Sequence, residues 1–87
     1  MKEYEWDNNK RAINLEKHGI DFIDAIEVFD DPDRIEASST RKGEERFEVI
    51  GIVHDVVIFV AYAIRKNKKR IISARRASRY EREEYHE

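Results

Sequence analysis

The sequence is poor in residues that crosslink a fold or sharply redirect the backbone: its 87 residues include no cysteine, one proline and three glycines. Without cysteine, a disulfide framework and a thiolate nucleophile are excluded, so packing must stabilise the fold. The longest apolar run, Val56 to Ile64, is too short to span a bilayer as a helix, and the first ten residues lack the apolar stretch of a signal peptide. We therefore expect a cytoplasmic protein with no membrane partner.

The motifs of metal and nucleotide sites are missing as well. His18, His54 and His86 are far apart in the sequence and belong to no H-E-x-x-H or Cys/His spacing. There is no G-x-x-x-x-G-K-[ST] phosphate loop, and no serine sits in a G-x-S-x-G elbow that would support covalent catalysis. We expect neither a metal ion nor a cofactor.

Charge is abundant and unevenly distributed. Residues 1–64 contain 8 Lys and Arg against 15 Asp and Glu, whereas residues 65–87 contain 9 against 4, so the net charge of −2 conceals a basic C-terminal part. The stretch Arg65–Arg79 has eight basic residues and no acidic one. Such a run attracts polyanions, most often phosphate backbones, although a solvated charged edge would have the same composition.

Capping residues predict two helices in the first third of the chain. Asp7 is suited to begin a helix over residues 8–18, and Gly19 can close it in the left-handed conformation. Asp21 can begin a second helix, which Pro32 cannot continue. One apolar stripe of this second helix is expected to be buried: Phe22, Ala25, Ile26 and Phe29.

The remaining chain is predicted to be mostly sheet. A short strand is expected over Lys2–Trp6, before the first helix. The apolar patterns then indicate strands over residues 34–40, 46–53, 56–64 and 70–76, separated by turns over 41–45, 54–55 and 65–69. Ser78 and Glu81 have the S-x-x-E spacing of a capping box, which predicts a terminal helix.

This order of elements predicts an α+β sandwich. Its mostly antiparallel sheet would combine a short N-terminal strand with a four-stranded meander, with two N-terminal helices packed on one face and a C-terminal helix. A chain of this length encloses one core, so we expect a single domain over residues 1–87. The other face could then meet a ligand. Regular alternation in the last strand separates Arg70, Ile72, Ala74 and Arg76 from Ile71, Ser73 and Arg75.

The available side chains suit the cleavage of RNA. The 2′-hydroxyl attacks its own phosphate, so a protein must orient that attack, neutralise the phosphorane charge and protonate the leaving 5′-oxygen. Arginine suits the second task because it is always charged and binds phosphate oxygens bidentately. Arg75 is the foremost candidate, since an arginine inside a regular strand requires a partner or a purpose.

Other candidates have structural interpretations that compete with function. His18 precedes the helix-closing glycine and can stabilise the negative helix end as well as act in catalysis. Trp6 is expected to anchor the core, and Tyr80 and Tyr85 to hold the last helix to the body.

Three long segments carry a resemblance to a known family. The stretches WDNNKRAINLEKHGIDFIDAIEVFDDP, GEERFEVIG and RIISARRASRYEREEYHE resemble the BrnT family, the toxins of BrnT/BrnA type II toxin–antitoxin systems. The resemblance implies a RelE-like fold and a metal-independent endoribonuclease that cuts RNA, with mRNA as the expected substrate, and so inhibits translation and growth. It also implies neutralisation by a BrnA-type antitoxin, through which the complex binds its own promoter DNA.

The resemblance and the charge pattern together give a set of candidate site residues. The catalytic candidates are Arg75, Arg46, His18, Lys17 and Glu45. The candidates for RNA binding are Arg65, Lys66, Lys68, Lys69, Arg70, Arg76 and Arg79. A non-catalytic nucleic-acid-binding module, or a protein-interaction module, could use the same basic edge Arg65–Arg79, and both alternatives stay open from the sequence.

Overall fold

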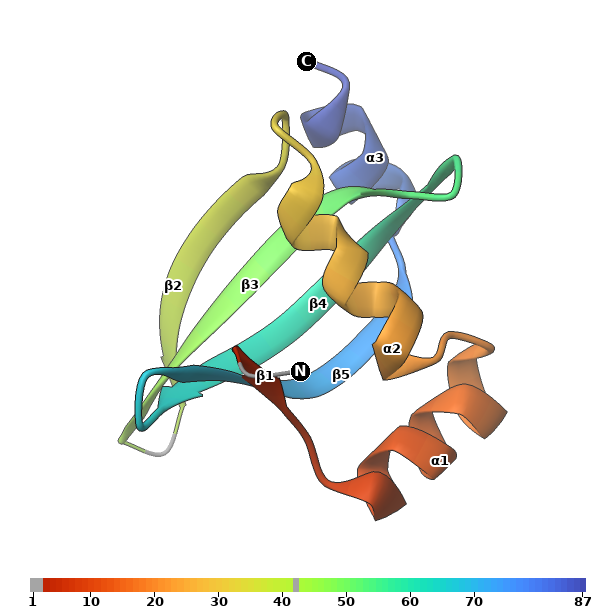
Figure 1. The fold of residues 1–87 in the computed structure, drawn as a ribbon. Coiled ribbons are helices and arrows are strands. Elements are labelled where there is room, and N and C mark those ends of the chain that lie inside the picture. Colours follow the sequence, from red (N-terminus) through yellow and green to blue (C-terminus); the bar gives the residue numbers. More distant parts are fainter. Residues whose placement is uncertain (1–2, 42) are drawn as a thin grey trace.

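The computed structural model describes residues 3–41 and 43–87, which form an α+β fold around one five-stranded sheet (Figure 1). The strand order is β1-β5-β4-β3-β2, so β4 is central, as its apolar residues on both faces predicted. The strands are β1 (Tyr4–Glu5), β2 (Ile35–Arg41), β3 (Glu44–Val53), β4 (Val56–Arg65) and β5 (Lys68–Arg76). The helices are α1 (Asn8–His18), α2 (Phe22–Ala25), the 3₁₀ helix η1 (Ile26–Asp30) and α3 (Arg79–Tyr85).

The predicted mostly antiparallel sheet is confirmed, with one parallel pair at its edge. The pairs β2–β3, β3–β4 and β4–β5 are antiparallel, whereas β1 runs parallel to β5, with Tyr4 opposite Lys69 and Glu5 opposite Arg70. The predicted first strand is shorter than expected, and its first residue, Lys2, lies outside the described residues. No helix in the described part of the chain is long and apolar enough to cross a membrane.

Two tight hairpins connect the last three strands. His54 and Asp55 have φ values of 49° and 67°, and Lys66 and Asn67 have φ values of 49° and 66°. Positive φ at both central residues is the geometry that matches the twist of the flanking strands, and asparagine and aspartate tolerate it. The two-residue turn at 54–55 is therefore confirmed, but the five-residue turn at 65–69 is wrong, because the basic residues on either side belong to the strands.

The predicted helix caps are confirmed. The Asp7 side chain accepts hydrogen bonds from the amides of Asn9 and Lys10, and Gly19, at φ 72°, donates its amide to the Leu15 carbonyl. Asp21 caps α2, but the chain tightens into η1 after one turn. In a 3₁₀ helix, residues three positions apart lie on the same side, so Val28 is buried on the same side as Ala25. Phe29 is only partly buried.

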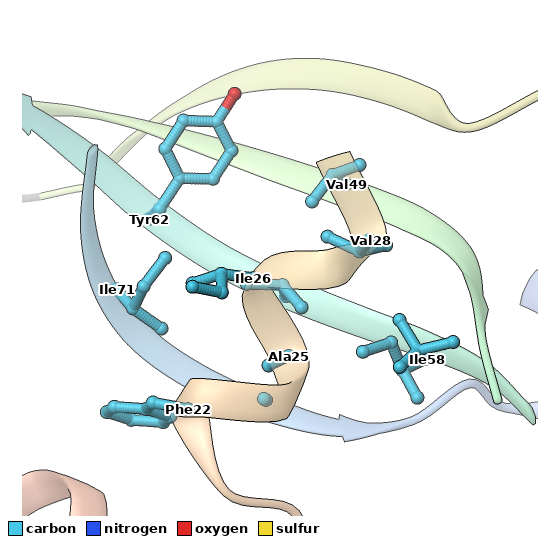
Figure 2. Packing of buried hydrophobic residues seen from close by; sticks show 11 residues of the cluster. Phe22, Ala25, Ile26, Val28, Val49, Ile58, Tyr62 and Ile71 are labelled. Carbon is cyan, nitrogen blue, oxygen red and sulfur yellow. The ribbon is translucent and has the colours of Figure 1, made fainter. Parts of the chain in front are cut away.

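The main core lies between one face of the sheet and the α2–η1 segment (Figure 2). Its largest fully buried side chains are Phe22, Val28, Val49, Val60 and Ile71. Burial of each contributes about 1.5–3 kcal/mol relative to exposure. Trp6 packs against Phe22 with ring centroids 6.3 Å apart, as its predicted role in the core requires.

A single buried amide ties α1 to the outer edge of β5. Asn14 is 6% exposed; its Nδ2 donates to the Ala74 carbonyl at 2.8 Å, and its Oδ1 accepts from the Ala74 amide at 3.1 Å. The same Nδ2 donates to the Ile20 carbonyl at 2.9 Å. The side chain thus replaces a neighbouring strand at this point, which satisfies backbone groups that would otherwise be unpaired.

A β-bulge in β5 changes which of its side chains share a face. Ser73 pairs with Ala61 and Ile71 pairs with Tyr62, so Ile72 is an extra residue without a partner. Ile71 and Ala74, three residues apart, are consequently both buried on the helix-covered face. The regular alternation predicted for the whole strand is therefore wrong before the bulge, although Arg75 and Arg76 still face opposite ways.

Candidate active site

A polar hollow lies on the face of the sheet that α2 and η1 leave uncovered, which we call the open face. Its volume is roughly 410 Å³. The floor includes Phe59 and Ala61 of β4, whose neighbours Ile58 and Val60 point into the core on the other face. Around this floor stand the polar and charged side chains of Ser39, Arg46, Glu48, Ser73, Arg75 and Glu81.

Arg75 is held on three sides in this hollow. Its Nη1 and Nη2 donate to the two carboxylate oxygens of Glu81 at 2.8 and 3.0 Å. Its guanidinium carbon lies 4.2 Å from the centre of the Phe59 ring, and Nη1 also donates to the Arg76 carbonyl at 3.2 Å. The bond to Glu81 raises the pKa of Arg75, against burial, and the charges of Glu81 and Glu48 add to the increase. The guanidinium is therefore a fixed, permanently charged donor.

Glu81 connects this arginine to the start of α3. It accepts from the Ser78 amide at 2.8 Å while the Ser78 hydroxyl accepts from the Glu81 amide at 3.2 Å, which confirms the predicted capping box. The hydrogen bond from Arg75 is the largest cause lowering the pKa of Glu81. One carboxylate thus fixes both the guanidinium and the first turn of the helix.

Arg46 and Glu48 come from β3 and face the hollow from the side opposite Arg75. Arg46 lies across from Ser39 of β2, and Glu48 lies between Ala37 and Ala61 on the neighbouring strands. Arg46 Nε is 3.3 Å from a Glu44 oxygen, whereas the described residues provide Glu48 with no ion pair within 4 Å. Sequence reasoning missed Glu48, although its i, i+2 spacing from Arg46 puts both on one face of a strand.

Three predicted catalytic residues lie outside the hollow. Lys17 and His18 are at the end of α1, beside the edge of β5. Glu45 precedes Arg46 in a regular strand, so alternation directs it to the opposite face. The structure therefore brings Arg46 and Arg75 together and leaves Lys17, His18 and Glu45 apart from them.

The predicted basic edge is divided between the two faces of the sheet. On the open face, Arg65 lies 3.8 Å from Glu44, and Arg70 pairs with Glu5 at 3.0 Å. On the other face, Lys69 Nζ lies 4.5 Å from the centre of the Phe29 ring. Arg76 borders a cavity beside His18 and His54, away from the open face.

The rest of the basic run is at the two ends of the sheet. Lys66 forms the β4–β5 turn, and Lys68 begins β5. Arg79, at the start of α3, is largely exposed and approaches Glu83 at 3.5 Å. The run is thus continuous in sequence but not in space.

The two tyrosines of α3 differ from one another. Tyr85 donates its hydroxyl to the buried carboxylate of Asp31, which confirms its predicted role of holding the helix to the body. Tyr80 is 75% exposed, so the same prediction for it is wrong. The two residues are five positions apart and therefore lie on different sides of the helix.

Asp31 receives several hydrogen bonds that offset its burial. Burial alone would raise its pKa, but the bonds from Tyr85 and from the Ile52 and Asp33 amides lower it below its ordinary value. The same contact raises the pKa of Tyr85 to about 12. In residues 3–41 and 43–87, no three side chains of the metal-ligating types lie close enough together to hold an ion.

Comparison with known proteins identifies one family. Residues 6–81 match a family model described as the ribonuclease toxin, BrnT, of a type II toxin–antitoxin system. A search of the curated proteins found no match.

Proposed function

The chain belongs to the BrnT family of type II toxin–antitoxin ribonuclease toxins, and on that premise we propose that it is an endoribonuclease whose active site is the open-face hollow. The observation that carries the proposal is Arg75, a permanently charged phosphate ligand fixed between Glu81 and the Phe59 ring in a hollow that also contains Arg46 and Glu48. A donor held at the reacting phosphate stabilises the negative charge that develops there.

The two arginines are assigned to the charge that develops on the phosphate. As the 2′-hydroxyl attacks, the phosphorane oxygens gain negative charge, and a donor that is already oriented stabilises it without reorganising. Arg75 enters from β5 and Arg46 from β3, so a phosphate over the Ala61 floor can be approached from two sides. Because arginine supplies this charge, the proposed reaction is metal-independent and needs no cofactor.

Glu48 is assigned as the general base. Its carboxylate takes the proton from the 2′-hydroxyl, the new bond forms between that oxygen and phosphorus, and the bond to the 5′-oxygen breaks. Water entering the open hollow supplies the proton to the leaving 5′-oxygen, and the hydroxide that remains takes the proton from Glu48, which regenerates the carboxylate. The products are a 2′,3′-cyclic phosphate and a free 5′-hydroxyl.

Residues around the hollow are proposed to capture the RNA by charge. Arg65, Lys66, Lys68 and Arg70 lie at the end of the sheet where β4 turns into β5, and Arg79 lies at the start of α3. Lys69 and Arg76 do not belong to this RNA-capturing set, because their side chains lie on the other face. Long-range attraction to the phosphate backbone does not require fixed geometry, so these residues affect affinity more than rate.

The finer biological assignments rest on the family. We propose that residues 1–87 form a single domain with a RelE-like fold. The protein would act on mRNA in the cytoplasm and so inhibit translation and growth. A BrnA-type antitoxin would neutralise it, and the complex would bind its own promoter DNA through that antitoxin.

The test is incubation of the purified chain with end-labelled RNA in the presence and absence of EDTA. We expect equal cleavage in both and 2′,3′-cyclic or 3′-phosphate ends. Loss of cleavage in EDTA that a divalent ion restores would refute metal independence. Binding without cleavage under either condition would instead support the second candidate function, a non-catalytic nucleic-acid-binding module that uses the paired arginines of the open face.

A further inference from the structure

A second, smaller hollow lies between α1 and the edge of β5. Its volume is roughly 200 Å³. Lys10, Ile13 and Lys17 of α1 form one side, and Ile72 and Ser73 of β5 form the other. We call this the α1–β5 groove. Asn14 anchors its base through the bonds to Ala74, so the two sides have a fixed separation.

The groove adjoins the open-face hollow at β5. Ile72 and Ser73 line both spaces, because the bulge at Ile72 turns two successive residues toward this edge. A ligand lying over Arg75 can therefore extend across Ser73 to α1 without crossing an element of the fold.

The charges of the two spaces differ. In the hollow and beside it, Arg46, Arg70 and Arg75 each face a carboxylate within 4 Å. No acidic side chain lines the groove, and among the described residues Lys10 and Lys17 have no ion-pair partner within 4 Å. Their ammonium groups are free to take a phosphate without displacing an internal partner.

The spacing along α1 suits an extended strand. Residues 10, 13 and 17 are separated by three and four positions and so share one side of the helix. The two lysines are about 10 Å apart along the helix axis, at 1.5 Å per residue. Between them Ile13 is 62% exposed, so an apolar side chain on this side of α1 is accessible to a ligand.

We propose that the α1–β5 groove binds the nucleotides that flank the scissile phosphate. Lys10 and Lys17 contact successive phosphates, and a base covers Ile13. This inference rests on the proposed function, because it takes the open-face hollow as the place of cleavage. It assigns Lys17 to substrate binding rather than to chemistry, and it makes the enzyme prefer RNA that is long enough to reach α1.

The experiment compares the parental chain with the double variant Lys10→Gln, Lys17→Gln on a three-nucleotide and a twelve-nucleotide RNA. For the longer RNA, KM should rise about tenfold in the double variant while kcat is unchanged, and the short RNA should be cut equally by both. Lys69→Gln is the charge-matched control, since Lys69 packs over Phe29 on the other face, and it should behave as the parent.

A binding measurement separates this inference from the proposed function. Fluorescence anisotropy would measure the affinity for a 2′-O-methyl twelve-mer, which cannot undergo the 2′-hydroxyl attack. The slope of the logarithm of the binding constant against the logarithm of salt concentration should be smaller in magnitude by about 1.4 in the double variant, because two phosphate contacts on a single strand are lost. If the parent cuts neither RNA but the two proteins differ in salt slope as predicted, RNA binding in the groove is supported and the proposed ribonuclease activity is refuted. If the parent cuts RNA and the double variant matches it in KM and salt dependence, the groove is refuted; loss of antitoxin binding alone would then assign it to the protein partner.

Discussion

The two faces of the sheet are built from alternate residues of the same strands, yet they differ in how far the side chains near the centre of each face are exposed. The face under α2 and η1 contains side chains with no exposed surface, such as Val49 and Val60. The open face, one residue along the same strands, has Glu48 and Phe59 in a hollow accessible to solvent. A period of two in the sequence therefore gives the sheet one buried face and one face with a solvent-accessible hollow.

The charged pairs of the open face remain accessible to solvent. No buried side-chain nitrogen or oxygen of the described residues lacks a hydrogen-bond partner, on either side of the sheet. On the open face, arginines are held by carboxylates that water can also reach, as in the pair of Arg75 and Glu81. The covered face should consequently contribute most to the stability of the protein, and the hollow of the open face should determine its rate of reaction.

The largest effect is expected from truncation on the covered face. Phe22→Ala should lower the free energy of unfolding by about 3–5 kcal/mol, because Phe22 is fully buried and the substitution leaves a cavity. Phe59→Ala, the same change on the half-buried open face, should lower it less but reduce cleavage by removing the support of Arg75. Chemical denaturation and single-turnover cleavage would measure both. Equal losses of stability would contradict the division between the faces.

The next effect concerns the proposed base. Glu48→Gln should reduce the single-turnover rate about a hundredfold, or about 2.7 kcal/mol in activation free energy, with unfolding nearly unchanged. Glu45→Gln provides the competing assignment, since Glu45 was the glutamate expected from the sequence. A hundredfold loss in Glu45→Gln with a parental rate in Glu48→Gln would reverse the assignment.

A smaller effect is expected where α3 joins the body. Tyr85→Phe should lower the free energy of unfolding at pH 7 by about 1 kcal/mol, because Asp31 loses a hydrogen bond. The folded pKa of Tyr85, about 12, lies above its ordinary value of 10.0, so this stabilisation is complete below pH 10 and is lost as pH rises toward 12. The lowered pKa of Asp31 predicts a second loss in acid, as pH falls through its folded value.

The exposed tyrosine of the same helix is the control for that prediction. Tyr80→Phe removes the same hydroxyl from a residue that is 75% exposed, and it should leave the pH dependence of unfolding as in the parent. If the free energy of unfolding changes with pH in the same way for Tyr85→Phe and the parent between pH 10 and 12, the hydrogen bond to Asp31 does not stabilise α3 as described.

Sequence reasoning succeeded where the physical rule is local. The caps at Asp7, Gly19 and Asp21, and the box of Ser78 and Glu81, depend on hydrogen bonds within four residues, so the pattern alone predicts them. The bulge at Ile72 depends on how β5 pairs with β4, and no residue of the strand marks it. The alternation predicted through this point was therefore wrong.

The candidate site was predictable to a similar extent. The sequence identifies Arg75 and Arg46 as candidates but does not place them on one face, and the structure brings both to one hollow. Glu48 was not identified, because a glutamate at an alternate strand position has the pattern of an ordinary solvated residue. The separation of Lys17 from the hollow depends on where α1 packs, which is a tertiary contact that its sequence does not specify.

The central claim is that Arg75 stabilises the transition state on the open face, and Arg34 offers a matched control for it. Both arginines pair with a glutamate at 2.8 Å, and their side chains are 37% and 33% exposed. The measurement is the single-turnover rate at saturating RNA for Arg75→Ala and Arg34→Ala, each checked for folding. We predict a loss of about a hundredfold or more for Arg75→Ala and the parental rate for Arg34→Ala. A folded Arg75→Ala that cuts saturating RNA at the parental rate would contradict the account.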